Sequence, residues 1–217
     1  MTDYKARRTM MVDTQVRPSD VTKFPIIDAM LSVPREEFVP ASLREAAYVG
    51  ENIALGANRV MLEPRTLAKM LDALSIEPDH VVLDLGCGLG YSTAILAKMA
   101  EFVVAVEDDA DNATQAQNIL SESGVDNAAV MQGALRDGAA KSAPYDIVMI
   151  QGAVEVVPDA ILAQLRDGGR IACIFAEGAL GVVRIGRKID GAVNWRYAFN
   201  AGAPVLSGFQ KEAAFSL

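Results

Sequence analysis

The hydrophobic positions in the first third of the chain are spaced as in helices. Residues 24–31 form an apolar segment that carries Pro25 near its start and ends before Pro34, as helices commonly do. After Pro64, four large apolar residues recur at steps of three and four, which places them on one helical face. They are Leu67, Met70, Leu71 and Leu74. We therefore predict two helices here and interpret the apolar stripe as core packing.

The pattern changes at residue 80, where short apolar runs begin to alternate with helical segments. Nearly continuous apolar runs are typical of strands that are buried on both faces. They occupy residues 81–85, 102–106, 128–131, 146–150 and 170–175. Helical patterns lie between them at residues 91–99, 112–121 and 158–165. This alternation predicts a parallel sheet with crossover helices.

The end of the chain has a different pattern, which is typical of antiparallel strands. Residues 182–189 and 192–199 flank Asp190-Gly191, a turn sequence that favours a β-hairpin. Residues 210–217 are a further candidate strand. We expect one domain of the α/β class, with a helical N-terminal cap (1–75), a core (80–176) and a β-rich C-terminal edge (177–217). The sheet should be mostly parallel and twisted, with helices on both faces and an antiparallel C-terminal edge.

Composition narrows the function classes. Of 217 residues, 51% are hydrophobic and the formal net charge is −8, so binding to nucleic acid is disfavoured because it needs clustered cations. No apolar run approaches the ~18 residues of a membrane span. The N-terminal basic residues precede no apolar run of the kind found in signal peptides. We expect a soluble, cytoplasmic protein with neither a membrane nor a nucleic-acid partner, and the oligomeric state stays open.

The chain contains few residues of the types that bind metals or form disulfides. Cys87 and Cys173 are the two cysteines and lie far apart, which suits a reducing compartment. His80 is the single histidine, so a multi-histidine metal site is excluded and we expect no bound metal. We interpret Cys87 as a small residue in a tight turn and His80 as a solvated loop residue.

A glycine-rich loop follows the first strand of the predicted core. The strand ends in Asp84 and Leu85, and Gly86, Gly88 and Gly90 follow before a helix begins. Glycines let the backbone turn sharply and approach a ligand closely, and the helix N-terminus attracts anionic groups. The spacing is GxGxG, whereas dinucleotide sites use GxGxxG, and no Gly-Lys-Ser/Thr follows as in a P-loop. The loop and the preceding Asp84 fit the methyltransferase pattern and favour S-adenosylmethionine (AdoMet).

The second core strand ends in Glu107, which we predict to bind the ribose of that ligand. A carboxylate at this position accepts hydrogen bonds from both ribose hydroxyls. Asp108 and Asp109 follow it. They are interpreted as a helix N-cap signal, with Asp108 able to flank the adenine.

Several segments together resemble the protein-L-isoaspartate (D-aspartate) O-methyltransferase family over about residues 7 to 170. The matching segments agree in order and spacing. They are residues 11–17, 33–40, 47–48, 82–91, 143–146, 164–165 and 168–170. The resemblance implies a Rossmann-like methyltransferase fold and methyl transfer from AdoMet to an isoaspartyl carboxylate of a damaged protein.

The resemblance also implies which residues form the site. The cofactor-binding candidates are Asp84, Gly86, Cys87, Gly88, Gly90, Tyr91, Glu107, Asp108, Gly133, Ala134 and Leu135. The family has Ile-Ser-Gln-Pro at the reacting centre, and the corresponding substrate candidates here are Met61, Leu62, Glu63 and Pro64. Leu62 therefore stands at the position of the family serine, and Ala134 at the position of an aspartate that lies near the adenine.

These departures leave the methyl acceptor open. Leu62 cannot form a side-chain hydrogen bond, and Glu63 would repel a substrate carboxylate. An ionised carboxylate acceptor needs no general base, but an amine or hydroxyl acceptor would benefit from one, and Glu63 is then the candidate. Its simpler interpretation is an acid favoured by a helix N-terminus. The alternatives to isoaspartyl repair are another acceptor on the same fold or AdoMet binding without turnover.

Overall fold

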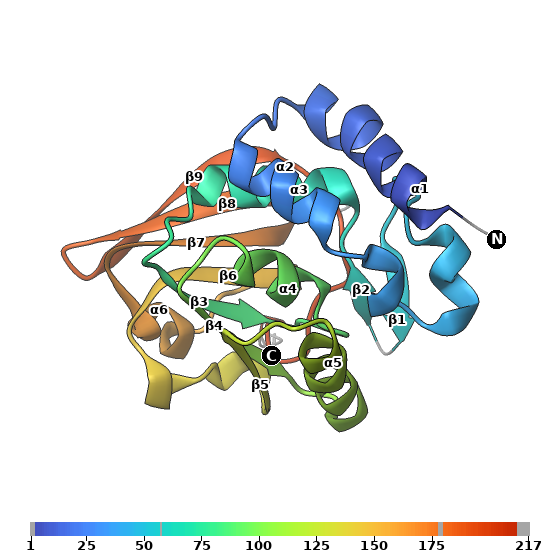
Figure 1. The fold of residues 1–217 in the computed structure, drawn as a ribbon. Coiled ribbons are helices and arrows are strands. Elements are labelled where there is room, and N and C mark those ends of the chain that lie inside the picture. Colours follow the sequence, from blue (N-terminus) through green and yellow to red (C-terminus); the bar gives the residue numbers. More distant parts are fainter. Residues whose placement is uncertain (1–2, 57, 178–179, 212–217) are drawn as a thin grey trace, which may run out of the picture.

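The computed structural model describes residues 3–56, 58–177 and 180–211, and its centre is a seven-stranded sheet (Figure 1). The strands are arranged in the order β5-β4-β3-β6-β7-β8-β9. They are β3 (Val81–Leu85), β4 (Phe102–Glu107), β5 (Ala128–Gln132), β6 (Tyr145–Val154), β7 (Leu165–Glu177), β8 (Leu180–Ile189) and β9 (Ala192–Asn200). Strands β3 to β7 pair in parallel, while β8 and β9 add an antiparallel edge. The predicted fold class is confirmed.

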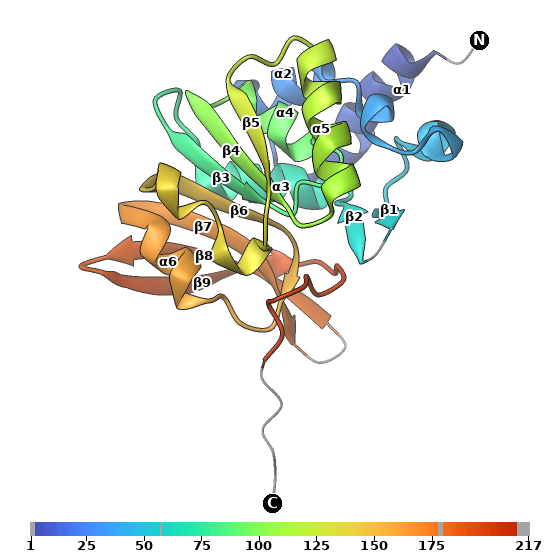
Figure 2. The same cartoon turned by 90° about the horizontal axis from the view of Figure 1, so that it is seen from below.

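Helices cover both faces of this sheet (Figure 2). On one face lie α3 (Pro64–Leu74), α4 (Tyr91–Ala97) and α5 (Ala110–Glu122), with α1 (Tyr4–Met11) and α2 (Phe24–Ser32) outside them. The other face carries α6 (Asp159–Gln164). Short 3-10 turns, at Arg17–Ser19, Arg35–Phe38, Ala41–Ala46, Leu135–Asp137 and Ala140–Ser142, and a π-helical turn at Val12–Val16 complete the helical elements in the described residues.

The alternation of side chains along each strand divides the core into two clusters. Val82 and Val103 face the helices α3 to α5, whereas Leu83 and Val104 face α6. The second cluster also contains Leu206 and Phe209, which lie after the last strand and are fully buried. The C-terminal segment therefore covers the α6 face of the sheet beside the glycine loop.

The structure differs from the expected helical cap at one place. Residues 1–75 contain a small antiparallel hairpin formed by β1 (Ile53–Gly56) and β2 (Arg59–Met61). These strands have four and three residues and, within the described part of the chain, pair only with each other. Their sequence is too short to show a strand periodicity. Of the candidate strand 210–217, Gln210 and Lys211 are not in a strand, and the remaining residues lie outside the described ones.

The α3 stripe packs as the sequence predicts, and Leu71 on that stripe is fully buried. We expect Leu71→Ala to lower the free energy of unfolding by about 2–5 kcal/mol, because it leaves a cavity between α3 and the sheet. Urea denaturation measures this loss. Ile189→Ala is the control, since Ile189 is 47% exposed and its truncation should cost less than about 1 kcal/mol. Equal losses in both variants would contradict this packing.

Candidate functional site

The glycine loop lies where the carboxyl ends of β3, β4 and β6 meet. Gly86, Gly88 and Gly90 have φ angles of 75°, 57° and 95°, in the left-handed region that favours glycine. Gly90 immediately precedes α4, which begins at Tyr91. The parallel sheet thus places the predicted loop at the edge where open α/β sheets bind ligands.

Asp84 connects this loop to the neighbouring elements through buried hydrogen bonds. Its carboxylate is fully buried and accepts hydrogen bonds from Ser92 Oγ at 2.7 Å and Thr93 Oγ1 at 2.8 Å. Gln151 Nε2 donates to the other oxygen at 2.8 Å. Burial raises the pKa of Asp84, and the three side-chain hydrogen bonds oppose that rise. The predicted site residue therefore ties β3 to the first turn of α4 and to β6.

Gln151 was not among the sequence candidates. It is buried in the carboxyl-terminal half of β6 and becomes a neighbour of Asp84 only through the pairing of β3 with β6. Ser92 and Thr93 were missed as well, although their place in the first turn after the glycine loop was a usable signal.

Glu107 holds the other side of the loop and is also fully buried. One oxygen, Oε2, accepts a hydrogen bond from the Gly88 amide at 2.8 Å. The other, Oε1, accepts from the amides of Asp108 and Asp109 at 3.1 and 3.3 Å. Burial raises the pKa of Glu107, while the Arg59 guanidinium and the Gly88 amide oppose the rise.

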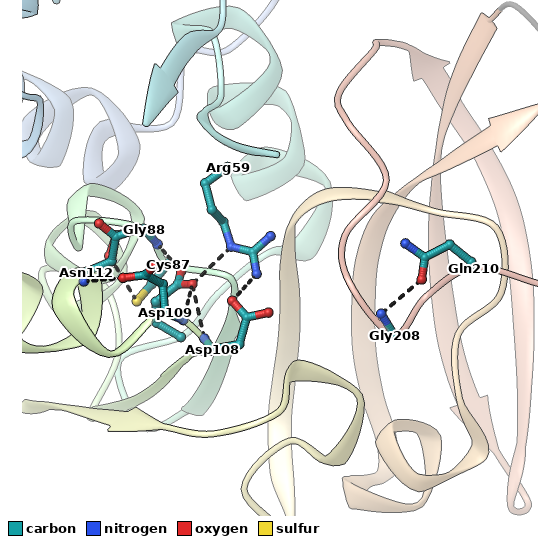
Figure 3. Close-up of polar contacts among 9 residues, drawn as sticks. Arg59, Cys87, Gly88, Asp108, Asp109, Asn112, Gly208 and Gln210 are labelled. Atoms are coloured by element: carbon teal, nitrogen blue, oxygen red, sulfur yellow. Dashed lines mark hydrogen bonds and ion pairs between the residues drawn. The ribbon is translucent and has the colours of Figure 1, made fainter. Parts of the chain in front are cut away.

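Arg59, which the sequence analysis did not consider, completes the surroundings of Glu107. Its Nε donates to Glu107 Oε1 at 3.0 Å, and its Nη2 donates to Asp108 Oδ1. The Arg59 side chain is only 3% exposed. Figure 3 shows Arg59 reaching toward Asp108 beside Gly88 and Cys87. The β1–β2 hairpin therefore places a cation directly on the predicted ribose-binding acid.

Asp108 and Asp109 have separate roles. Asp109 caps α5, because its carboxylate accepts the Asn112 amide at 2.8 Å, which confirms the N-cap prediction. Asp108 instead pairs with Arg59 and lies at the edge of an open surface cavity of about 450 Å³. Asn58, Ser207 and Gln210 also line this cavity. It adjoins the carboxyl end of β4, where the sequence predicts the adenine.

The remaining adenine-side candidates lie after β5. The Gly133 amide donates to the Glu107 carbonyl at 3.0 Å, and Ala134 is exposed. Leu135 is fully buried in the cluster on the α6 face. These residues connect β5 to the core, and Ala134 brings no polar side chain to the place of the family aspartate.

The substrate candidates lie between the hairpin and α3. Met61 and Leu62 are buried and line a small cavity of about 10 Å³, which has room for about one water molecule. Leu55 and Cys87 line the same cavity. The hairpin thus closes over the glycine loop, and Leu62 contributes an apolar wall.

Glu63 directly precedes α3, which begins at Pro64. Its carboxylate accepts a hydrogen bond from Thr66 Oγ1 at 2.6 Å and faces Arg65 at 3.8 Å. Its backbone amide donates to Asn52 Oδ1 at 2.8 Å. This geometry agrees with an acid at a helix N-terminus, the simpler of the two interpretations.

Arg35 holds the predicted substrate segment, residues 61–64, through hydrogen bonds to the backbone. It is fully buried and donates to the carbonyls of Ala47 and Leu62, at 2.7 and 2.8 Å. Its guanidinium lies 4.8 Å from the centre of the Tyr91 ring. Burial lowers the pKa of Arg35, and the neighbouring Tyr91 opposes that change. Tyr91, a cofactor candidate, therefore packs against Arg35 and Phe38 on the side of the N-terminal cap.

Two further features limit the chemistry of the described residues. Cys87 is a buried free thiol, and burial raises its pKa well above the ordinary value, which makes it a poor nucleophile. In the described part of the chain, no cluster of three or more His, Cys, Asp or Glu side chains could hold a metal ion.

None of the helices described is long and apolar enough to span a membrane.

The family model and the curated relatives point to one family. The family model for protein-L-isoaspartate(D-aspartate) O-methyltransferase matches residues 7–200. The chain is 32% identical over 191 residues to the protein-L-isoaspartate O-methyltransferase of Koribacter versatilis, covering 88% of this chain and 86% of that one. It is 33% identical to the protein of the same name from Syntrophus aciditrophicus, covering 79% and 78%.

Solved structures show the same fold. A protein-L-isoaspartate O-methyltransferase superposes with a TM-score of 0.81 at 20% identity, covering 94% of this chain and 66% of that one. A Plasmodium falciparum protein described as a putative enzyme of this type, in complex with S-adenosyl-L-homocysteine, gives a TM-score of 0.80 at 16% identity, covering 95% and 99%.

The contact between Gln151 and Asp84 leads to a stability prediction. Gln151→Leu removes a hydrogen-bond donor from a buried carboxylate, so we expect the free energy of unfolding to fall by about 1–3 kcal/mol. Gln132→Leu is the control, because Gln132 is exposed at the end of β5 and its change should cost less than about 0.5 kcal/mol. Urea denaturation compares the two, and an unchanged stability of Gln151→Leu would show that this hydrogen bond does not support the loop.

Proposed function

The chain belongs to the protein-L-isoaspartate(D-aspartate) O-methyltransferase family, and from this membership we propose that it methylates the free carboxylate of isoaspartyl residues in damaged proteins. It is an AdoMet-dependent methyltransferase. The single observation that carries the proposal is the match of the family model to residues 7–200, which includes the glycine loop, the hairpin and the substrate segment.

The residues present suit the cofactor in their placement. Three glycines with left-handed backbone conformations lie at the carboxyl end of β3. Glu107 lies at the end of β4 and accepts a hydrogen bond from the Gly88 amide. The open cavity beside Asp108 offers about 450 Å³ on the adenine side. In this proposal Glu107 would hold the ribose, Asp108 would flank the adenine, and Gly86, Gly88 and Gly90 would approach the remainder.

AdoMet supplies an activated methyl group, so the protein's tasks are to bind, to orient and to exclude water. A carboxylate acceptor is ionised near neutral pH and needs no base. Met61 and Leu62 would shield the acceptor from solvent with apolar surface. The hydrogen bond that Arg35 donates to the Leu62 carbonyl and the one that the Glu63 amide donates to Asn52 would keep this segment in place.

The direct test is methyl transfer from labelled AdoMet to an isoaspartyl peptide and to its normal aspartyl twin. We expect label in the isoaspartyl peptide alone, in a base-labile methyl ester. Label in neither peptide, with AdoMet binding intact by calorimetry, would redirect the assignment to another acceptor. The apolar Leu62 at the family serine position is the observation that favours such an acceptor.

Glu63→Gln separates the two kinds of acceptor. Since a carboxylate needs no general base, we expect kcat/KM for the isoaspartyl peptide to stay within about threefold of the wild type or to rise. The amide introduced by this substitution keeps an oxygen that can accept from the Thr66 hydroxyl, so the start of α3 should be preserved. A loss of about 10²–10⁴-fold would instead identify Glu63 as a base and contradict carboxylate methylation.

A further inference from the structure

We propose that Arg59 occupies the ribose position of the cofactor site, so that it competes with AdoMet and sets the affinity of this protein for its cofactor. The inference rests on the proposed function, because it takes AdoMet as the ligand and Glu107 as its ribose acid. It concerns a residue of the β1–β2 hairpin that the family assignment leaves without a role.

The first observation is that Glu107 has no exposed surface. Its side chain is 0% exposed, and both oxygens already accept hydrogen bonds. A ribose can contact this carboxylate only after a group that covers it has moved. Three of the donors are backbone amides of the loop and of the residues after β4, whereas Arg59 donates from a side chain of the hairpin.

The second observation is that the guanidinium has the donor chemistry of a ribose. A ribose presents two adjacent hydroxyl donors to the acid. Arg59 directs Nε to Glu107 and Nη2 to Asp108, so it satisfies the ribose acid and its neighbour together. The pair lies out of solvent, where an ion pair is weakly screened and a carboxylate without a partner is costly. Arg59 is therefore an internal substitute for the nucleoside.

The third observation is that the hairpin carrying Arg59 also covers the loop itself. A Cβ atom placed on Gly88 would lie 2.5 Å from Leu55 Cδ1, so Leu55 rests against the backbone that a ligand would approach. The cavity that Leu55 lines measures about 10 Å³. Arg59 and Leu55, both from this hairpin, therefore occupy two parts of the proposed site: the space beside Glu107 and the space next to the glycine loop.

The hairpin pairs separately from the main sheet, so the contacts of Arg59 can be exchanged without breaking the seven-stranded sheet. Within the described residues, β1 and β2 pair with each other and with no strand of the main sheet. Gly56, at the end of β1, and Asn58, just before β2, both have positive φ. Withdrawal breaks the contacts of Arg59 with Glu107 and Asp108, and the ribose hydroxyls then replace the guanidinium donors. The affinity of a ligand falls in proportion to the fraction of open molecules, so an open fraction of about one tenth lowers it about tenfold.

The experiment compares S-adenosyl-L-homocysteine binding by calorimetry in the wild type, Arg59→Gln and Arg59→Lys. We expect Arg59→Gln to bind about tenfold more tightly, because the competitor is gone. Arg59→Lys should be intermediate, since lysine keeps the charge but loses the forked geometry that contacts both acids. Arg184→Gln is the matched control: it removes a surface pair with Glu177 and should bind within about twofold of the wild type.

A ligand-free measurement checks the same idea. Hydrogen exchange of residues 53–61 and of the Gly88 amide should accelerate in Arg59→Gln and stay unchanged in Arg184→Gln. If Arg59→Gln does not fold, because Glu107 is left buried without a cation, Arg59→Lys gives both measurements. Binding by the Arg59 variants that is no tighter than that of the wild type would overturn the inference.

The outcomes also separate this inference from the proposed function. Tighter binding by Arg59→Gln without methyl transfer to the isoaspartyl peptide would refute the function and support the role of Arg59. Methyl transfer to the isoaspartyl peptide, with equal affinities for S-adenosyl-L-homocysteine in the wild type and the three variants, would support the function and refute the role of Arg59. Absence of binding in every protein would overturn both.

Discussion

The burial of two carboxylates at the ends of neighbouring parallel strands is the constraint on which the rest of this structure depends. Asp84 and Glu107 are both withdrawn from water, and a buried carboxylate is tolerated only where donors surround it. The donors come from separate parts of the chain: α4 and β6 serve Asp84, while the glycine loop and the hairpin serve Glu107. The two acids therefore bring these elements together around the loop.

The two acids differ in what they do for a ligand. Asp84 is satisfied by hydroxyl and amide side chains that belong to the scaffold, so it keeps the loop and α4 in register. Glu107 is satisfied partly by the hairpin, which among the described residues pairs with no strand of the main sheet. In the proposed site, the scaffold would hold Asp84, while the partner of Glu107 would be exchanged for the nucleoside.

The segments at the two ends of the chain support this arrangement from opposite faces. Near the N-terminus, Arg35 holds the carbonyl of Leu62 and so ties the substrate segment to the cap. Near the C-terminus, Leu206 is buried and lies so close to Gly152 that a Cβ atom there would be 2.5 Å from it. Both ends are therefore part of the wall around the loop, although neither contains the glycine motif.

The sheet, its helices and the position of the glycine loop could be predicted from the sequence, because burial on both faces and helical spacing leave strong local patterns. The place of Glu107 at a strand end and the capping role of Asp109 were predictable for the same reason. The contacts of Gln151 with Asp84, of Arg59 with Glu107 and of Leu55 with Gly88 became visible only in the folded chain. The two polar pairs join residues 67 and 48 positions apart, and a three-residue strand such as β2 carries too few positions for a pattern. Local spacing predicts elements, whereas the neutralisation of a buried charge depends on which distant side chain the fold brings to it.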